Sequence, residues 1–371
     1  MDFDFSDDQE QLRDAVRKWV DKGYDFDRRR AIVAAGGFDR AAYSEMAELG
    51  LTGLYVSEDH GGMGMGPTEA MVTMEELGRG IVLEPLTQTL MCSATLQTHA
   101  PAALQAAWLP RMAAGEAIVV LAHQERAARY QLSRCAALAS ESNGAWSVTG
   151  SKSLVAVGDQ ADAFVVPATV NGQIALFLVE RNASGVSTQA YITQDGSRAA
   201  EVVFNKTTAQ LITLNGLTAL EEAVDIGIAC TCAEAVGVMD KTLAITVDYM
   251  NTRKQFGVAI ASFQALRHRV ADMKMQLELG RSMSYYASLK LHAPVDERRR
   301  ALARAKYQLG VSMRLIGQQA VQLHGGIAVT DEYIVSHYFK KLTQLDMTFG
   351  DTLHQLGEVS ARMQETAGVF A

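Results

Sequence analysis

A stretch of about one hundred residues with β-strand character interrupts an otherwise helical chain, and this interruption constrains the fold more than any other feature. From about residue 119 to 215 the sequence consists of short alternating or β-branched runs, such as AWSVTG, DAFVVPATV and IALFLVE. Asn-Gly and Asp-Gly pairs punctuate these runs, as is typical of strands joined by tight turns. The pattern therefore predicts a small antiparallel β-unit between two helical regions.

Helical periodicity marks both flanks of this unit. The segment SDDQEQLRDAVRKWV opens with a Ser/Asp cap and continues with apolar residues at helical spacing. Long helical patterns follow the β-unit, and 371 residues exceed what one small core accommodates. We therefore expect an α+β protein of three domains: an N-terminal α-helical domain (1–118), a middle β-barrel or β-sandwich domain (119–216) and a C-terminal helical bundle (217–371).

Composition excludes several classes of protein. The 34 Lys and Arg against 42 Asp and Glu give a net charge of −8, so we expect no nucleic-acid partner. No apolar run reaches the roughly 18 residues of a membrane span, and the acidic start MDFDFSDDQEQL differs from a secretory signal. The four cysteines lack disulfide or zinc spacing. We expect a cytoplasmic protein with ordinary thiols and no metal.

The segment YMNTRKQFG, residues 249–257, closes a long helix and places Arg253 and Phe256 three positions apart on one helical face. A guanidinium can hold a phosphate through two parallel hydrogen bonds, and an adjacent aromatic side chain offers a flat surface for a ring. The alternative interpretation is a cation placed at a helix C-terminus, where the helix dipole favours it.

The segment QLHGGIAVTDEY, residues 322–333, combines Gln322 with Gly325 and Gly326 after another helix. Two adjacent glycines let the backbone approach a ligand closely and direct N–H groups toward an oxygen. The alternative interpretation is a helix that simply ends at glycine.

Taken together, these motifs resemble the acyl-CoA dehydrogenase family. RKQFG, SFQALRHRVADM, a basic helix and QLHGGIAVTDEY are similar to its C-terminal domain, while FSDDQEQLRDAVRKWV, ELGLTGLYVSEDHGGMGM and EELGRG resemble its opening helices. The resemblance covers nearly the whole chain. It implies an FAD enzyme that dehydrogenates the α and β carbons of an acyl-CoA, with a carboxylate that removes the α proton.

The resemblance also implies a division of the cofactor between subunits. Family members are typically dimers of dimers, in which the flavin ring lies on the middle domain of one subunit and the ADP half reaches the C-terminal domain of its neighbour. The positions that match the ADP-contacting pattern are Arg253, Gln255, Phe256, Gln264, Gln322, Gly325 and Gly326.

The flavin-facing positions do not match the family. A Thr-Glu-Pro and a Gly-Ser-Asp cradle the flavin in the family pattern, whereas this chain has LAHQERAARYQLS, in which His123, Gln124 and Glu125 can still form hydrogen bonds. The family's Trp-Ile-Thr-Asn-Gly corresponds to LVAVGD, which contains no aromatic residue. We expect a degraded flavin-facing surface.

The catalytic base is missing from its usual place. The family's Glu corresponds to Phe349, and the alternative base position falls near Gly227. We expect Asp351 to be the N-cap of the last helix and Asp346 to be a surface acid. The base therefore stays unknown. Glu221, Glu222 and Asp225 lie near the alternative position in the sequence, and an unorthodox mechanism would use Asp351, Glu221 or Glu222.

This combination resembles the small subunits of heteromeric acyl-CoA dehydrogenases. The resemblance implies an α2β2 assembly in which a dissimilar subunit supplies the carboxylate, with an acyl-CoA as substrate and an electron-transfer flavoprotein as acceptor. Two alternatives stay open: a homotetramer with an unorthodox base, and a non-catalytic structural or regulatory paralogue.

Overall fold

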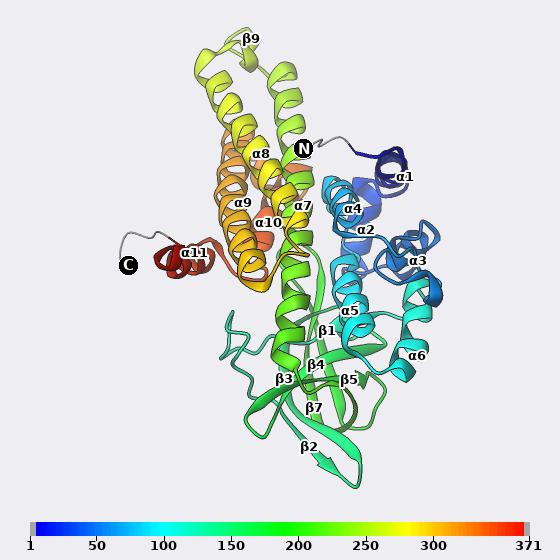
Figure 1. Cartoon of the computed structure of the whole chain (residues 1–371). Helices are drawn as coiled ribbons and strands as arrows, with labels where there is room; N and C mark the ends of the chain where they lie inside the picture. The colour runs from blue at the N-terminus through cyan, green and yellow to red at the C-terminus, as the bar shows by residue number, and fades with distance from the viewer. Residues whose placement is uncertain (1–4, 367–371) are drawn as a thin grey trace. The chain divides into compact units, whose positions relative to one another are not determined.

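The structure is a computed structural model that describes residues 5–366, with the side chains described up to residue 363. Its N-terminal part is helical (Figure 1). The helices are α1 (Asp7–Gly23), α2 (Phe26–Ala34), α3 (Arg40–Glu48), η1 (Leu51–Gly53), η2 (Glu58–His60), α4 (Pro67–Arg79), α5 (Leu86–His99) and α6 (Ala102–Ala113).

The middle of the chain forms a seven-stranded sheet. Its strands are β1 (Val119–Leu121), β2 (Leu138–Ser142), β3 (Ala145–Ala156), β4 (Ala163–Val170), β5 (Gln173–Glu180), β6 (Val186–Ile192) and β7 (Arg198–Thr213). Strands follow the order β1-β4-β2-β3-β7-β5, and β5 also pairs with β4, which closes the sheet on itself as a barrel. Buried aromatic rings of Phe164, Phe177 and Phe204 fill its interior with Val and Ala side chains.

The rest of the chain is mainly helical. It comprises α7 (Gly216–Thr252), the two-stranded hairpin of β8 (Lys254–Gln255) and β9 (Val258–Ala259), η3 (Ile260–Ser262), α8 (Gln264–Leu289), α9 (Val295–His324), η4 (Gly325–Val329), α10 (Ile334–Met347) and α11 (Thr352–Thr366). The predicted α+β class, with a helical N-terminal region, a central β-domain and a C-terminal helical region, is confirmed.

Internal contacts divide the chain into two compact units. Unit 1 comprises the residues up to Arg28, Pro67–Val82 and the chain from Ile228 onward; unit 2 comprises Arg29–Gly66 and Leu83–Gly227. Helix α7 thus begins in unit 2 and continues in unit 1. The three domain ranges given above stay a prediction, and each unit is described by itself below.

Local signals in the sequence explain where elements begin. Ser6 caps α1 in a reciprocal capping box, because its hydroxyl accepts from the backbone N–H of Gln9 while the Gln9 side chain accepts from the backbone N–H of Ser6.

None of the helices within residues 5–366 has the length and apolarity needed to span a bilayer. In the same residues no group of His, Cys, Asp and Glu side chains is arranged to hold a metal ion.

Helices α4 and α7 of unit 1 approach each other closely at two glycines. A Cβ atom added at Gly237 would lie 1.8 Å from the carbonyl oxygen of Glu75, and one added at Gly78 would lie 2.2 Å from the carbonyl oxygen of Glu234. Backbone atoms cannot move aside as a flexible side chain can. Both glycines are therefore required by packing rather than by a turn.

Replacing Gly237 should consequently destabilise the protein. We expect Gly237→Ala to lower the free energy of unfolding by about 2 kcal/mol or more through overpacking. Gly357→Ala in α11 is the matched control, because nothing lies within 4 Å of its added Cβ; alanine in an open helical position should be neutral or stabilising by roughly 0.5 to 1 kcal/mol. Urea denaturation of both variants checks this, and equal stability would contradict the packing argument.

Candidate cofactor site

The first predicted cofactor segment forms an exposed hairpin after α7. Helix α7 ends at Thr252, so Arg253 follows the helix, Gln255 lies in β8 and Phe256 occupies the turn. The expectation that Arg253 and Phe256 share one helical face is therefore wrong, because the chain leaves the helix before both residues. Phe256 is 91% exposed and has a positive φ of 54°, and its ring meets that of Phe263 edge to face at 6.1 Å. Gln264, the first residue of α8, is also exposed. A large aromatic side chain held in solvent on a strained backbone indicates a contact surface.

The second predicted segment lies beside the first within unit 1. The Tyr249 hydroxyl, near the end of α7, donates to the carbonyl oxygen of His324 at 3.2 Å, and their rings stack at 4.4 Å. These contacts place Gln322, Gly325 and Gly326 next to the end of α7. The structure thus brings together two motifs that are separated by about 70 residues in the sequence.

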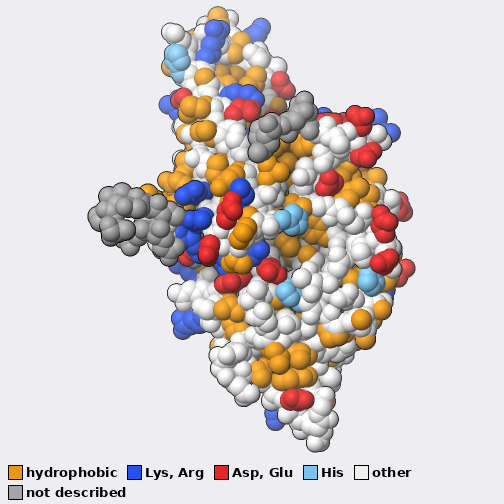
Figure 2. All heavy atoms as spheres, in the orientation of Figure 1, with side chains coloured by type: hydrophobic (Ala, Val, Ile, Leu, Met, Phe, Trp, Pro, Cys, Tyr) orange, Lys and Arg blue, Asp and Glu red, His pale blue; other side chains and the backbone are white. Residues whose placement is uncertain are grey.

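The geometry of these two segments suits an anionic, aromatic ligand. No described residue pairs with the Arg253 guanidinium, and a Cβ added at Gly325 or Gly326 would enter open space. The imidazole Nε2 of His324 is buried without a hydrogen-bond partner. Figure 2 shows hydrophobic and basic side chains gathered at the end of the helices that carries the hairpin. These residues fit the ADP half of FAD.

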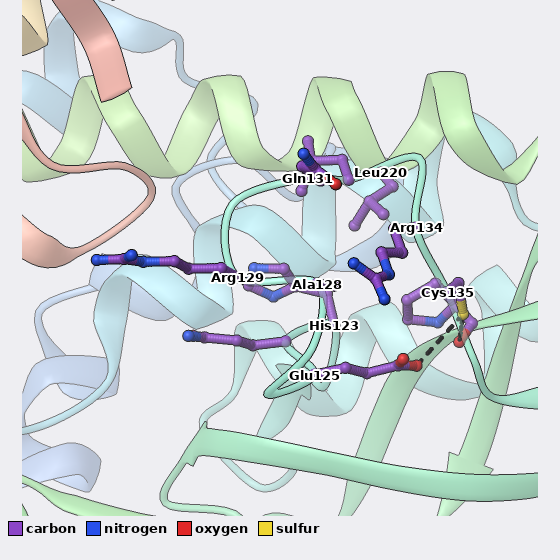
Figure 3. A pocket seen from close by; sticks show the side chains of 11 residues that line it. His123, Glu125, Ala128, Arg129, Gln131, Arg134, Cys135 and Leu220 are labelled. Carbon is purple, nitrogen blue, oxygen red and sulfur yellow. Dashed lines mark hydrogen bonds between the residues drawn. The ribbon is translucent and has the colours of Figure 1, made fainter. Parts of the chain in front are cut away.

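The edge of unit 2 that the family resemblance predicts to face the flavin is built differently. Glu125, which follows β1, is 7% exposed, and one of its carboxylate oxygens accepts from the Nζ of Lys152 at 2.7 Å. The same carboxylate accepts from the backbone N–H groups of Ala136 at 2.7 Å and Ala137 at 3.1 Å. Lys152 lies in β3 with a fully buried side chain. The Glu125 carboxylate therefore joins the beginning of the loop between β1 and β2 to the end of that loop and to strand β3. Figure 3 shows Glu125 beside Cys135 of the same loop.

Electrostatics keep this pair charged. Burial alone would raise the pKa of Glu125, but the hydrogen bond and charge of Lys152 and the two backbone donors outweigh it and hold that pKa below its ordinary value. Burial and the Lys152 charge lower the pKa of His123 to about 4, so its imidazole is neutral at pH 7. Glu125 is thus a structural carboxylate, and this edge does not fit the flavin ring as the family pattern requires.

The segment that corresponds to the family's flavin-stacking motif is altered as well. Leu154 stands where the family has an aromatic residue, and it is 51% exposed with a φ of 53°. The hydroxyl of Tyr191, from β6, accepts from the backbone N–H of Leu154 at 3.1 Å and donates to Glu201 at 3.2 Å. An aromatic side chain from another strand therefore reaches this position, which the linear motif could not reveal.

The turn between α10 and α11 carries the family's base position. Phe349 has a φ of 56° there and Gly350 a φ of 109°. Asp351 caps α11, because its carboxylate accepts from the backbone N–H of His354 at 2.9 Å, as predicted from the sequence. This turn keeps an unusual backbone but offers a phenyl ring in place of a carboxylate.

Asp346 is not the surface acid that we expected. Its side chain is only 16% exposed and accepts from the Thr352 hydroxyl at 2.6 Å. The fully buried Lys306 of α9 lies below the same turn and donates to the carbonyl oxygens of Leu345 at 2.7 Å and Asp346 at 2.9 Å. The expectation failed because tertiary contacts from α9 and α11 enclose a residue that ends an amphipathic helix.

The other candidate acids lie at the beginning of α7, in unit 2. A carboxylate oxygen of Glu222 lies within hydrogen-bond distance of the Nε2 of His99, at 2.8 Å, and Asp225 is 2% exposed. Gly227 is buried within the helix. The structure therefore gives Glu222 a partner and places no carboxylate at the family's alternative base position.

Comparison with known proteins identifies the family. The model for the acyl-CoA dehydrogenase N-terminal domain matches residues 6–116, and that for the C-terminal domain matches residues 215–364. The chain belongs to the acyl-CoA dehydrogenase family. Its members are FAD-dependent oxidoreductases that act on acyl-CoA thioesters.

Individual relatives agree with this assignment. The acyl-CoA dehydrogenase IpdE2 of Mycobacterium tuberculosis is 28% identical over 336 residues, which is 90% of each chain. A variant of the Tcur3481-Tcur3483 steroid ACAD has a TM-score of 0.90 and 26% identity, covering 97% of this chain and 99% of that one. Butyryl-CoA dehydrogenase from Megasphaera elsdenii shares the fold, with a TM-score of 0.90 at 23% identity over 98% of this chain and 100% of that one.

Sequence reasoning missed Lys152 as the partner of Glu125. A signal was available, because Lys152 lies four residues after the buried Val148 and therefore on the same, inward face of β3. A lysine at an inward strand position needs a buried acid or other acceptors for its ammonium group, since an unpaired buried charge is very costly. Which acid pairs with Lys152 could not be predicted, because it depends on how the strands of the barrel align.

Lys306 should give the protein a specific pH dependence. Burial lowers the pKa of this lysine from 10.5 to about 8. Between these two values the unfolded chain binds a proton that the folded chain does not, so the free energy of unfolding rises with pH over this range. The stability of the wild type relative to Lys306→Met should therefore increase from pH 8 to about 10.5. Urea denaturation across this range, with exposed Lys18→Met as control, checks it; a pH-independent difference would contradict it.

Proposed function

We propose that this chain is one subunit of a heteromeric, FAD-dependent acyl-CoA dehydrogenase that carries out α,β-dehydrogenation of an acyl-CoA. It is the subunit that lacks the catalytic base. In this proposal it contributes the residues that hold the ADP half of FAD, while a dissimilar partner supplies the catalytic carboxylate. The assembly would be α2β2, with two related chains replacing two identical ones around a twofold axis.

One observation carries the proposal: the two ends of the expected cofactor site differ in this chain. In the segments predicted to bind ADP, the side chains of Arg253, Gln255, Gln264 and Gln322 have no partner among the described residues, whereas the buried Glu125–Lys152 pair holds the loop predicted to face the flavin. A chain that had lost the enzyme's function altogether would gain nothing from holding Phe256 in solvent. We expect a chain that shares its cofactor with a partner to keep the residues for the ADP half and to lose those for the flavin ring.

Each predicted residue has a role that its chemistry supports. The Arg253 guanidinium would hold the diphosphate, Phe256 would pack against a ring, and the backbone at Gly325 and Gly326 would approach the nucleotide. Gln255, Gln264 and Gln322 would supply hydrogen bonds. When bound, FAD supplies the hydride-accepting group of the reaction. These residues bind and orient; none of them exchanges a proton with the substrate.

The two family base positions hold Phe349 and Gly227 instead of a carboxylate, which supports a partner that supplies one. Phe349 cannot accept a proton, and the Asp351 carboxylate is used to cap α11. The similar steroid ACAD carries two designations, Tcur3481 and Tcur3483, which is consistent with a pair of chains. By analogy with it we propose a bulky acyl group, such as a steroid side chain, and by analogy with the family an electron-transfer flavoprotein as acceptor in the cytoplasm.

Mutation of Arg253 tests the cofactor role. Arg253→Ala should reduce the FAD content of the co-purified complex, because removing one member of a charge pair commonly costs about 2 to 5 kcal/mol. Exposed Arg304→Ala is the matched control and should leave the FAD content unchanged. Flavin absorbance per mole of protein measures both; full flavin content in Arg253→Ala would refute the clamp.

Mutation of Asp351 tests whether this chain carries the base. Asp351→Asn should leave the dehydrogenation rate of the complex within a few-fold of wild type, since asparagine is an equally good N-cap. Asp351→Ala should lower the free energy of unfolding by about 1 kcal/mol through loss of the cap. A rate decrease of several orders of magnitude in Asp351→Asn would instead identify Asp351 as the catalytic base.

A further inference from the structure

A thiol, an amine and a carboxylate meet at one point in unit 2. Cys135 lies in the loop between β1 and β2, and its sulfur is 3.5 Å from a carboxylate oxygen of Glu125, a contact that Figure 3 shows. The buried Lys152 of β3 donates to the same sulfur, with 3.5 Å between its Nζ and the Cys135 Sγ. An amine nitrogen therefore lies next to an oxidisable sulfur, and the acid that accepts from this nitrogen at 2.7 Å lies beside both.

Cys135 is also the cysteine that an oxidant can reach. It is half-buried, whereas Cys92, Cys230 and Cys232 are buried, and all four thiols are free. Cys135 lines a pocket that is partly open to solvent and has room for about one water molecule. A small hydroperoxide such as hydrogen peroxide can therefore approach its sulfur.

The surroundings of the thiol set its reactivity, because the thiolate is the nucleophile. Burial raises the pKa of the Cys135 thiol, and the opposing charge of Lys152 only partly offsets burial and Glu125. Burial raises the pKa of Cys230 and of Cys232 to about 12, and both side chains are closed to solvent. We therefore expect Cys135 to react before the buried cysteines, and to react faster as the pH rises.

We infer that Cys135 and Lys152 form a redox modification site, at which a hydroperoxide joins Sγ and Nζ in a reversible sulfenamide bond. In the first step the sulfur attacks one peroxide oxygen and loses two electrons. The S–O bond forms, the O–O bond breaks, and the second oxygen takes the thiol proton and leaves as water. The product is a sulfenic acid, which condenses with nitrogen nucleophiles.

The second step uses all three side chains. Lys152 gives one proton to Glu125, and its neutral amine then attacks the sulfenic sulfur. The S–N bond forms, the S–O bond breaks, and the hydroxyl group leaves as water with a second proton from the nitrogen. Cys135 lies in a loop rather than in a strand, so its backbone can shift toward β3 to close the remaining distance.

The linked site leaves no charge unpaired in the interior. Before the reaction the site holds the Lys152 ammonium and the Glu125 carboxylate; afterwards the sulfenamide nitrogen is uncharged and Glu125 keeps the proton. An unpaired buried charge would be very costly, and this exchange avoids it. The bond would fix the loop between β1 and β2 covalently to β3, and the inference does not depend on the proposed function.

Peroxide treatment of the full-length chain, followed by tryptic digestion and mass spectrometry, tests the inference. Trypsin cuts after Arg134 and after Lys152, so the unmodified chain gives the peptide 135–152. A linked Lys152 resists cleavage, and the next site is Arg181, so the linked chain should give the peptide 135–181. This peptide should be lighter by two hydrogen atoms than its unlinked form, and dithiothreitol should restore 135–152.

Cys135→Ser is the test variant, and the three buried cysteines are internal controls. The variant should give only the peptide 135–152 after peroxide treatment. In wild type, the buried cysteines should be oxidised roughly tenfold or more slowly than Cys135. Unfolding curves of Cys135→Ser, expected to match wild type, verify the fold, and the wild-type digest decides the question on its own.

Four outcomes would overturn the inference. In the first, trypsin still cuts after Lys152 while Cys135 gains oxygen, which shows that the amine does not capture the sulfur. In the second, Cys135 is not oxidised. In the third, the buried cysteines react as fast as Cys135. In the fourth, Cys135→Ser also gives the peptide 135–181.

Discussion

The buried ion pair between Glu125 and Lys152 is the interaction on which the functional interpretation depends. A lysine with no exposed side-chain surface needs partners for its ammonium group, because an isolated ammonium in an apolar core is prohibitively costly, and here the main partner is a carboxylate. Its partner, Glu125, also accepts from the backbone of Ala136 and Ala137, so one carboxylate fixes the whole loop between β1 and β2. The edge of unit 2 that the family resemblance predicts to contact the flavin therefore binds this chain's own backbone instead.

Helix α9 organises the other half of the site. Toward its N-terminal half, Lys306 supports the turn that carries Phe349, and Gly310 has no room for a Cβ because Thr352 and Asp346 lie against it. At its C-terminal end, His324 stacks on Tyr249 and joins the two predicted ADP segments. Helix α9 therefore supports the turn at Phe349, which has no catalytic base. It also supports the segments predicted to hold the ADP half of FAD, whose polar side chains are open to solvent.

Much of the fold followed from periodicity, and the limits of the prediction have physical causes. The change from period 3.6 to period 2 located the barrel, and the caps at Ser6 and Asp351 follow from local backbone chemistry. The Glu125–Lys152 pair and the environment of Asp346 could not be predicted, because each depends on elements that are distant in sequence and meet only in the tertiary structure. The assignments of Arg253 and its neighbours came from family resemblance, and the structure adds their proximity and exposure.

The distribution of FAD between this chain and a partner tests the central claim most directly. The chain should be purified alone and after co-expression with a related dehydrogenase chain that has a carboxylate at the position corresponding to Phe349, and the absorbance near 450 nm measured for each. We predict little or no flavin for the isolated chain and about one FAD per pair of dissimilar chains, as expected for a shared site. One tightly bound FAD per isolated chain would contradict the account.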